Sequence, residues 1–269
     1  MSANTERMTN APVYYALVQV KFTPVAAMSK YVPVIQDALR VEGFPLFELD
    51  NSTRLKFEIK NQNEQPAHSV ENVTDWLMIS ADKHSGFILG QDFITFHTTK
   101  YETHEPFISN ALLGLSKVFE FAKPSFVTRI GLRYLDAVFP NANEDIDQYL
   151  VPGLHGINLG LTPIQSIQES VYQTSVDPLV TNGFMITRIH KIIGQLGFPP
   201  DMVPKGLRPL DRFNNTKACL HAIIDTDHYV EGSMSPDVAP IEKQMISLHS
   251  KANDAFKKMV TEFAFSKWK

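Results

Sequence analysis

The stretch Thr128-Arg129-Ile130-Gly131-Leu132-Arg133-Tyr134-Leu135-Asp136, near the middle of the chain, predicts a β-strand with two unlike faces. Side chains in a strand alternate between its faces. The apolar face carries Ile130, Leu132 and Tyr134. The opposite face carries Arg129, Gly131 and Arg133. Arginine is rarely fully buried without a partner, so the second face must have a polar contact.

Composition places this strand in an ordinary globular protein. The chain has 269 residues, of which 43% are hydrophobic and 20% charged, which argues against extensive disorder. The net charge is −4, whereas a nucleic-acid-binding domain usually has a basic surface. The single cysteine, Cys219, excludes an intramolecular disulfide and a zinc site built from several thiolates.

The first eleven residues are polar and predict a disordered tail without a signal peptide. No apolar run in the sequence approaches the ~20 residues that a membrane-spanning helix needs. We therefore expect a soluble, cytoplasmic protein that has no membrane partner.

The N-terminal half of the chain alternates between strand and helix patterns. The first strand is predicted at 13–22, followed by a helix that Thr23-Pro24 would cap and that Gly43 would end, with Pro33 inside it. The remaining predicted elements are a strand at 54–60, an antiparallel meander at 76–99 and a helix at 105–122.

The C-terminal half follows a similar order, beginning with the central strand at 126–139. The other predicted elements are a short helix at 144–150, strands at 170–176, 184–193 and 217–225, a turn at 225–229 and one helix from 235 to 263. The pattern predicts an α+β fold in which an antiparallel sheet packs against long helices. Two loosely similar halves, 12–124 and 125–269, would follow the tail at 1–11 and form one compact unit.

Four phrases of the sequence together resemble a known protein family. They are Val13 to Val25, Ile35 to Pro45, Arg129 to Val138 and, in the last helix, Ser247 to Phe256. The family is an uncharacterised, sporadically distributed bacterial and archaeal family of about this length and of unknown function. The resemblance implies no catalytic residues. Its sporadic distribution implies an accessory role, of the defence or toxin-neutralising type.

Arg129 and Arg133 are the first candidate site. Guanidinium groups bind phosphate and carboxylate groups bidentately, so an anionic ligand could sit here, with Arg208 and Arg212 contributing from a later loop. The alternative is that the two strand arginines form internal ion pairs, for instance with Glu58 or Glu120.

A second candidate is a metal site formed by His221, Asp225 and Asp227, with His190 from a neighbouring strand. On a strand the first three would share a face, and such ligands can hold a cation that activates water. The alternative is that these residues are solvated at a strand end.

A third candidate lies on the final helix, where His249 and Asn253 are one turn apart. This pair suits acid–base chemistry, yet no nucleophile accompanies it. The alternative is that His249 anchors the helix to the sheet through a hydrogen bond.

The segment 197–213 predicts a long loop of the kind that often forms a lid or a partner contact. Its basic residues, Lys205, Arg208 and Arg212, could close over an acidic partner. Exposed Phe198 and Phe213 would fit a protein interface.

Three hypotheses about function follow. The first is a soluble, non-catalytic binding protein of an accessory system, which binds a protein partner or an anionic ligand. The second is a metal-dependent hydrolase or nuclease that uses the His/Asp cluster. The third is a nucleotide or phosphate sensor that uses Arg129 and Arg133. The sequence identifies no cofactor and no catalytic residue, and it is compatible with a homodimer.

Overall fold

Strand β6 (Val127–Val138), which contains the quoted stretch, lies near the centre of a nine-stranded antiparallel sheet. The computed structural model describes residues 8–58, 67–161, 163–174, 183–214 and 217–269. Residues 1–7 of the predicted tail lie outside the described residues. The strand order is β2-β3-β4-β5-β1-β6-β9-β8-β7.

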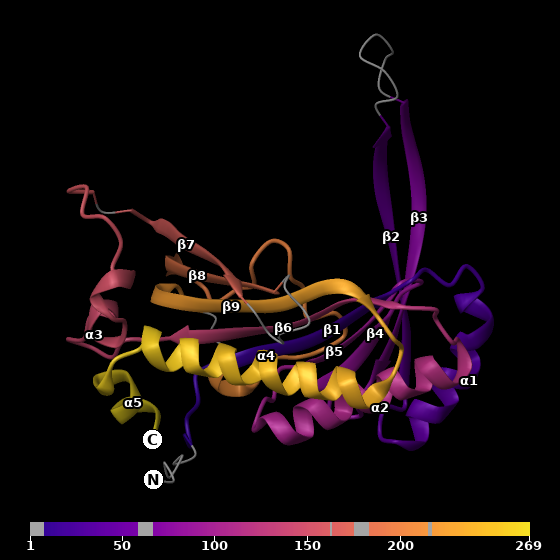
Figure 1. Ribbon diagram of the computed structural model, residues 1–269. Helices are drawn as coiled ribbons and strands as arrows, with labels where there is room; N and C mark the ends of the chain where they lie inside the picture. Colours follow the sequence, from indigo (N-terminus) through magenta and orange to yellow (C-terminus); the bar gives the residue numbers. More distant parts are fainter. Residues whose placement is uncertain (1–7, 59–66, 162, 175–182, 215–216) are drawn as a thin grey trace.

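The N-terminal half contributes the five neighbouring strands at one end of the strand order, β2-β3-β4-β5-β1. Its elements are β1 (Val13–Phe22), α1 (Met28–Val41), β2 (Leu46–Glu58), β3 (Ala67–Ile79), β4 (Ser85–Leu89), β5 (Phe93–Thr98) and α2 (His104–Phe121). The predicted first strand and the predicted meander are therefore confirmed. Strands β2 and β3 form a long hairpin that extends away from the rest of the sheet (Figure 1).

The C-terminal half contributes the four strands at the other end, β6-β9-β8-β7. Its elements after β6 are α3 (Ile146–Tyr149), β7 (Gln165–Thr174), β8 (Gly183–Gly194), β9 (Cys219–Met234), α4 (Val238–Met259) and α5 (Glu262–Trp268), with short 3₁₀ turns at Pro152–Leu154 and Asp211–Phe213. The described fold is thus the predicted mixture of helices and antiparallel sheet. Because the halves contribute five and four strands, their internal similarity stays a prediction.

Helices α1, α2 and α4 cover one face of the sheet, here called the helix side (Figure 1). Ile130, Leu132 and Tyr134 of β6 point into this layer, as the alternating pattern predicts. Gly114 lets α2 lie close to the sheet, because a Cβ atom there would stand 2.4 Å from the ring of Phe87. Apolar burial against these helices holds the centre of the sheet in place.

The opposite face, here called the loop side, is covered at its centre by the irregular segment 195–214. Met202 and Phe213 of this segment are buried against Tyr14, Tyr15 and Leu135 of the sheet. The two faces of β6 therefore pack against different kinds of structure: helices on one side and loop on the other.

Two helix predictions are wrong at their ends. Helix α1 begins at Met28, since Thr23 uses its hydroxyl to accept hydrogen bonds from the backbone N–H groups of Ser125 and Phe126. The last helix is divided in two, because Val260 is extended and bridges to Leu150 before α5 begins.

Three strand predictions are also wrong. Strand β7 begins at Gln165 rather than at residue 170. Strand β2 already begins at Leu46, where it pairs with Ile79, rather than at residue 54. Strand β9 runs unbroken through the turn predicted at 225–229. Arginines on the neighbouring strands neutralise the acidic residues that suggested the turn. No helix among the described residues is long and apolar enough to cross a membrane.

Candidate functional site

A cleft of about 610 Å³ opens on the helix side, between α4, the end of β6 and the segment that leads into α2. We call it the helix-side cleft. Its lining comprises Met8, Ala11, Pro12, Val13, Tyr101, Glu102, Thr103, His104, Glu105, Tyr134, Asp136, Thr226, Ile246, His249, Ser250, Ala252, Asn253, Phe256 and Lys257.

Strand alternation places the sheet residues of this cleft. Tyr134 and Asp136 lie two positions apart on β6, so both continue the face that carries Ile130 and Leu132. Thr226 of β9 is directly opposite Tyr134 in the strand pairing. The sheet thus presents a phenol, a carboxyl and a hydroxyl group side by side.

Asp136 is the least expected of these residues. Asp136 is only 3% exposed, and its carboxyl group makes no hydrogen bond to the described part of the chain. Burial, with a smaller contribution from the charge of Asp225, raises the pKa of Asp136 to about 8. The group therefore keeps its proton at neutral pH.

The hydroxyl group of Thr226 is a second unsatisfied polar group. Its oxygen is buried and has no hydrogen-bond partner among the described residues. Native proteins pair most buried polar groups, so such exceptions often mark places where a ligand or water binds.

His249 forms one wall of the cleft together with His104. Its Nδ1 lies 3.0 Å from the hydroxyl oxygen of Tyr134, and the two imidazole rings are stacked with centroids 4.6 Å apart. Burial, followed by the nearby His104, lowers the pKa of His249 to about 4. The bond to Tyr134 supports the interpretation of His249 as an anchor for the last helix, but the ring also borders the cleft.

The loop side of β6 has a contrasting arrangement around Arg133. This residue is 8% exposed, and its guanidinium donates two hydrogen bonds to Asp225, of 2.8 and 2.7 Å, and two to Asp201, of 2.5 and 3.2 Å. Arg188 lies 3.4 Å from Asp225 and 2.5 Å from Glu169. The hydrogen bond from Arg133 lowers the pKa of Asp201.

Arg129 is neutralised in a looser way. It lies 3.7 Å from both Asp227 and Glu231 and stands over the ring of Tyr229 at 4.2 Å. Internal ion pairs therefore account for both strand arginines. Glu120, proposed above as a partner, instead lies 3.7 Å from Lys117.

The other two arginines of the predicted anion site lie elsewhere. Arg208 donates to the backbone oxygen of Asp82, between β3 and β4. Arg212 donates to the backbone oxygen of Ala11, just before β1. Arg129 lies at the other end of β1, where its backbone is opposite Lys21 in the strand register. The four arginines consequently do not converge on one ligand.

The residues of the predicted metal site share the loop-side face but form no metal centre. His221 donates a 3.1 Å hydrogen bond from Nδ1 to the backbone oxygen of Cys219, while Asp225 is bound by arginines. His190 lies 3.9 Å from Asp225. Across the described residues, no group of three or more His, Cys, Asp and Glu could hold a metal ion.

The alternative interpretation of this cluster is wrong as well. His221 and Asp225 are fully buried rather than solvated, because β9 lies in the interior of the sheet between β6 and β8.

The predicted partner contacts also need correction. Phe213 is buried and Phe198 partly buried, since both pack on Tyr14, and Phe198 also packs on Tyr15. Lys205 of the same loop is bound to Asp50 and Asp75 of its own chain. The loop covers the sheet and uses its aromatic groups for that purpose.

Sequence analysis missed Asp136, Thr226 and Tyr101, although one signal was present. Asp136 stands at the end of the apolar face of its strand, where a carboxyl group is out of place. Nothing local relates it to His249, which is more than a hundred residues away in the chain.

Comparison with models of known protein families and with curated proteins finds no match to this chain, so the resemblance described above stays a prediction.

Proposed function

We propose that this protein is a non-catalytic binding protein whose helix-side cleft takes a small organic ammonium ion. The observation that carries the proposal is the buried, unpaired carboxyl group of Asp136 in a cleft of ligand size. Ligand sites commonly measure about 300–1,000 Å³ and carry a few placed polar groups within an apolar lining.

The walls of the cleft support a cationic ligand. Tyr101, Tyr134 and Phe256 present aromatic rings, whose faces attract ammonium groups. Glu102 and Glu105 add carboxylates, against a single lysine, Lys257. The charge balance therefore favours a cation over an anion.

The loop side offers less support for the anionic ligand expected from the sequence. Each strand arginine there has carboxylate neighbours in its own chain. An anion would have to displace Asp201 or Asp225 from Arg133, at the cost of leaving a carboxylate unpaired.

Proton release gives the proposal a specific signature. An ammonium ion beside Asp136 favours the ionised carboxylate, so binding below pH 8 should expel the proton that burial retains. Affinity should rise with pH up to about 8 and level off above it.

Titration calorimetry with choline, and with its uncharged isostere 3,3-dimethylbutan-1-ol as a control, tests this proposal. Repeating the choline titration at pH 7 in two buffers of different ionisation enthalpy measures the protons released. We expect choline to bind, the alcohol to bind more weakly, and close to one proton to leave. Asp136→Asn should abolish proton release and weaken binding by about 10-fold or more.

Asp254→Asn is the matched control, because Asp254 is an exposed carboxylate of α4 outside this cleft. It should bind choline as the wild type does. Equal binding of the charged and uncharged probes, or an Asp136→Asn variant with unchanged affinity, would refute the proposal.

Acid–base catalysis is a second candidate, favoured by one observation. The cleft holds a carboxyl group that retains its proton and an imidazole that lacks one, since the pKa values of Asp136 and His249 are about 8 and about 4. Mass spectrometry of a bound amine after long incubation distinguishes the candidates: recovery of unchanged ligand supports binding alone.

The biological setting remains a proposal that rests on the resemblance. In a defence or toxin-neutralising system, the bound ammonium ion or a protein partner would be the signal to which this protein responds. The hydrolase and phosphate-sensor hypotheses have weaker support, because the residues that each requires are bound to one another.

A further inference from the structure

The outer edge of β7 is the second feature that calls for a partner. Among the described residues this strand pairs only with β8, so one row of its backbone groups faces outward. Its ten residues include one charged side chain, Glu169, whose carboxylate lies 2.5 Å from Arg188. An edge without unpaired charge or proline is a template for adding another strand.

Apolar side chains accompany this edge. Ile167 and Val171 lie on the loop-side face of β7 and are 57% and 58% exposed. The segment leading into the strand exposes Ile157, Leu159 and Ile164 to an even greater degree. Soluble proteins rarely leave such a patch uncovered.

The opposite edge of the sheet, formed by β2, differs from the β7 edge in its number of charged residues. The sequence of β2 contains five charged residues within thirteen, whereas that of β7 contains one within ten. Charges of this kind prevent edge-to-edge pairing. The chain therefore protects one edge and leaves the other ready to pair.

We propose that β7 pairs antiparallel with β7 of a second copy of this chain, around a two-fold axis at Glu169, so that the sheet continues through the dimer. In this register Ile167 lies opposite Val171 of the partner subunit, which joins apolar residues on the same face. The two Glu169 carboxylates meet at the axis, where the Arg188 guanidinium of each chain, 2.5 Å from its own Glu169, offsets part of their mutual repulsion.

The pairing of Glu169 with Arg188 is the reason for preferring a second copy as the occupant. A two-fold interface places every group against its own symmetry mate, so an unpaired charge at the axis would repel itself. The edge of β7 carries none, and its apolar residues flank Glu169 symmetrically, two positions before and two after.

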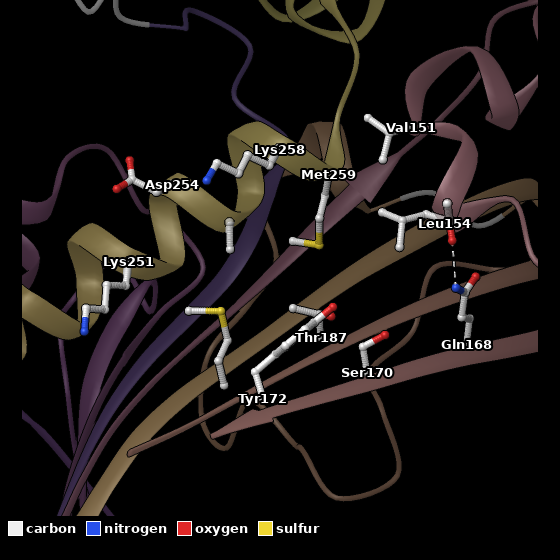
Figure 2. Close-up of a pocket in the computed structure, with 13 residues that line it drawn as sticks. Val151, Leu154, Gln168, Ser170, Tyr172, Thr187, Lys251, Asp254, Lys258 and Met259 are labelled. Carbon is white, nitrogen blue, oxygen red and sulfur yellow. Dashed lines mark hydrogen bonds between the residues drawn. The ribbon is translucent and has the colours of Figure 1, made fainter. Parts of the chain in front are cut away.

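Pairing would also enlarge a groove on the helix side. Figure 2 shows this groove, of about 630 Å³, between α4 and the sheet, with Ser170 and Tyr172 of β7 pointing toward it. Gln168 closes one end by donating to the backbone oxygen of Gly153. A partner strand beside β7 would extend the floor of this groove beyond Tyr172.

Disulfide trapping tests the register. In a Cys219→Ser background, Glu169→Cys places two thiols on the axis, where Cα atoms of paired strands are about 4.5–5.5 Å apart, within the range that a disulfide spans. We expect a covalent dimer under mild oxidation. Gln165→Cys is the control: its two copies would be roughly 27 Å apart and should remain unlinked. A monomeric Glu169→Cys protein, or equal linking of both variants, overturns the proposal.

Sedimentation analysis with matched charge insertions gives a second test. Val171→Lys, on β7, should raise the dimer dissociation constant about 30-fold by placing a charge opposite Ile167 at two symmetric positions. Leu49→Lys, on the charged edge and 57% exposed, should leave the dimer intact. Circular dichroism confirms that each variant folds. A monomeric wild type, or a folded Val171→Lys protein that stays dimeric, overturns the proposal.

Discussion

Arg133 and Asp136 lie three positions apart on the same strand, face opposite sides of the sheet and are almost equally buried, yet their surroundings differ completely. Arg133 on the loop side donates four hydrogen bonds to two carboxylates. Asp136 on the helix side has no hydrogen-bond partner within the described chain. The same degree of burial therefore accompanies a fully paired charge on one face of the strand and an unpaired carboxyl group on the other.

The two residues avoid the cost of a buried charge in different ways. An isolated buried ion is highly unfavourable, so such groups are either paired or neutralised. Arg133 remains charged and is paired, while Asp136 is neutralised because it retains its proton. A paired charge stabilises a fold, and a neutral acid beside a cleft is available to a ligand.

Removing the carboxylate of Asp225 should produce the largest effect. Asp225→Asn leaves the buried Arg133 with only the exposed end of its network, so we expect the free energy of unfolding to fall by about 3–5 kcal/mol. Urea denaturation at pH 7 measures it. The control is Asp227→Asn, which should cost clearly less, because its carboxylate makes only a 3.7 Å contact with Arg129 and burial already raises its pKa. Equal losses would show that the loop-side network is not dominated by Arg133.

The dependence of stability on pH should reveal Asp136 next. The folded protein binds a proton that the unfolded chain releases near its ordinary pKa of 3.8, because the folded pKa is about 8. The contribution of Asp136 to stability is therefore greatest at acid pH and declines as pH rises from about 4 to about 8.

Asp136→Asn should remove this decline, so the variant should gain on the wild type, by an amount on the order of 2 kcal/mol or more, between pH 5 and pH 9. Chemical denaturation of both proteins at the two pH values measures the difference. A constant offset between them would mean that Asp136 titrates alike in the folded and unfolded states.

A smaller effect is expected at the wall of the cleft. Tyr134→Phe removes the 3.0 Å contact with Nδ1 of His249, which should lower stability by about 1 kcal/mol. The aromatic face remains, so the affinity for choline should change little. A large loss of binding with full stability would instead assign the hydroxyl group to ligand recognition.

The smallest effect belongs to Glu105, an exposed carboxylate at the edge of the cleft. Glu105→Gln should leave the stability of the protein unchanged and weaken choline binding about twofold, with the loss vanishing at high salt. Titrations at about 20 mM and about 500 mM salt provide the measurement, because the Debye length shortens as salt is added and the interaction is then screened.

The central strands could be predicted from the sequence because their information is local. Alternation of apolar residues located β1, and it located β6 to within a residue at each end. Thr23 failed as a helix cap since its hydroxyl is used by the chain around Ser125, a hundred residues later.

The strand conformation of the acidic segment of β9 and the position of the cleft were not predicted from the sequence, and the physical reason is the same for both. Asp225 is compatible with a strand only because Arg133 and Arg188 neutralise it from both neighbouring strands. Likewise, the stack of His104 on His249 depends on how α2 and α4 pack. A single sequence does not reveal such distant contacts, although the carboxyl group on the apolar face of β6 was visible.

The thinness of the sheet links its two surfaces. Asp225 is paired with Leu135, the neighbour of Asp136, and its negative charge contributes to the raised pKa of Asp136 through one layer of backbone. The charge of Asp225 is in turn balanced by Arg133, which Asp201 binds from the segment over the loop side. A carboxylate that belongs to the loop-side ion-pair network therefore helps to hold the proton in the helix-side cleft, and the two faces of the sheet are electrostatically coupled.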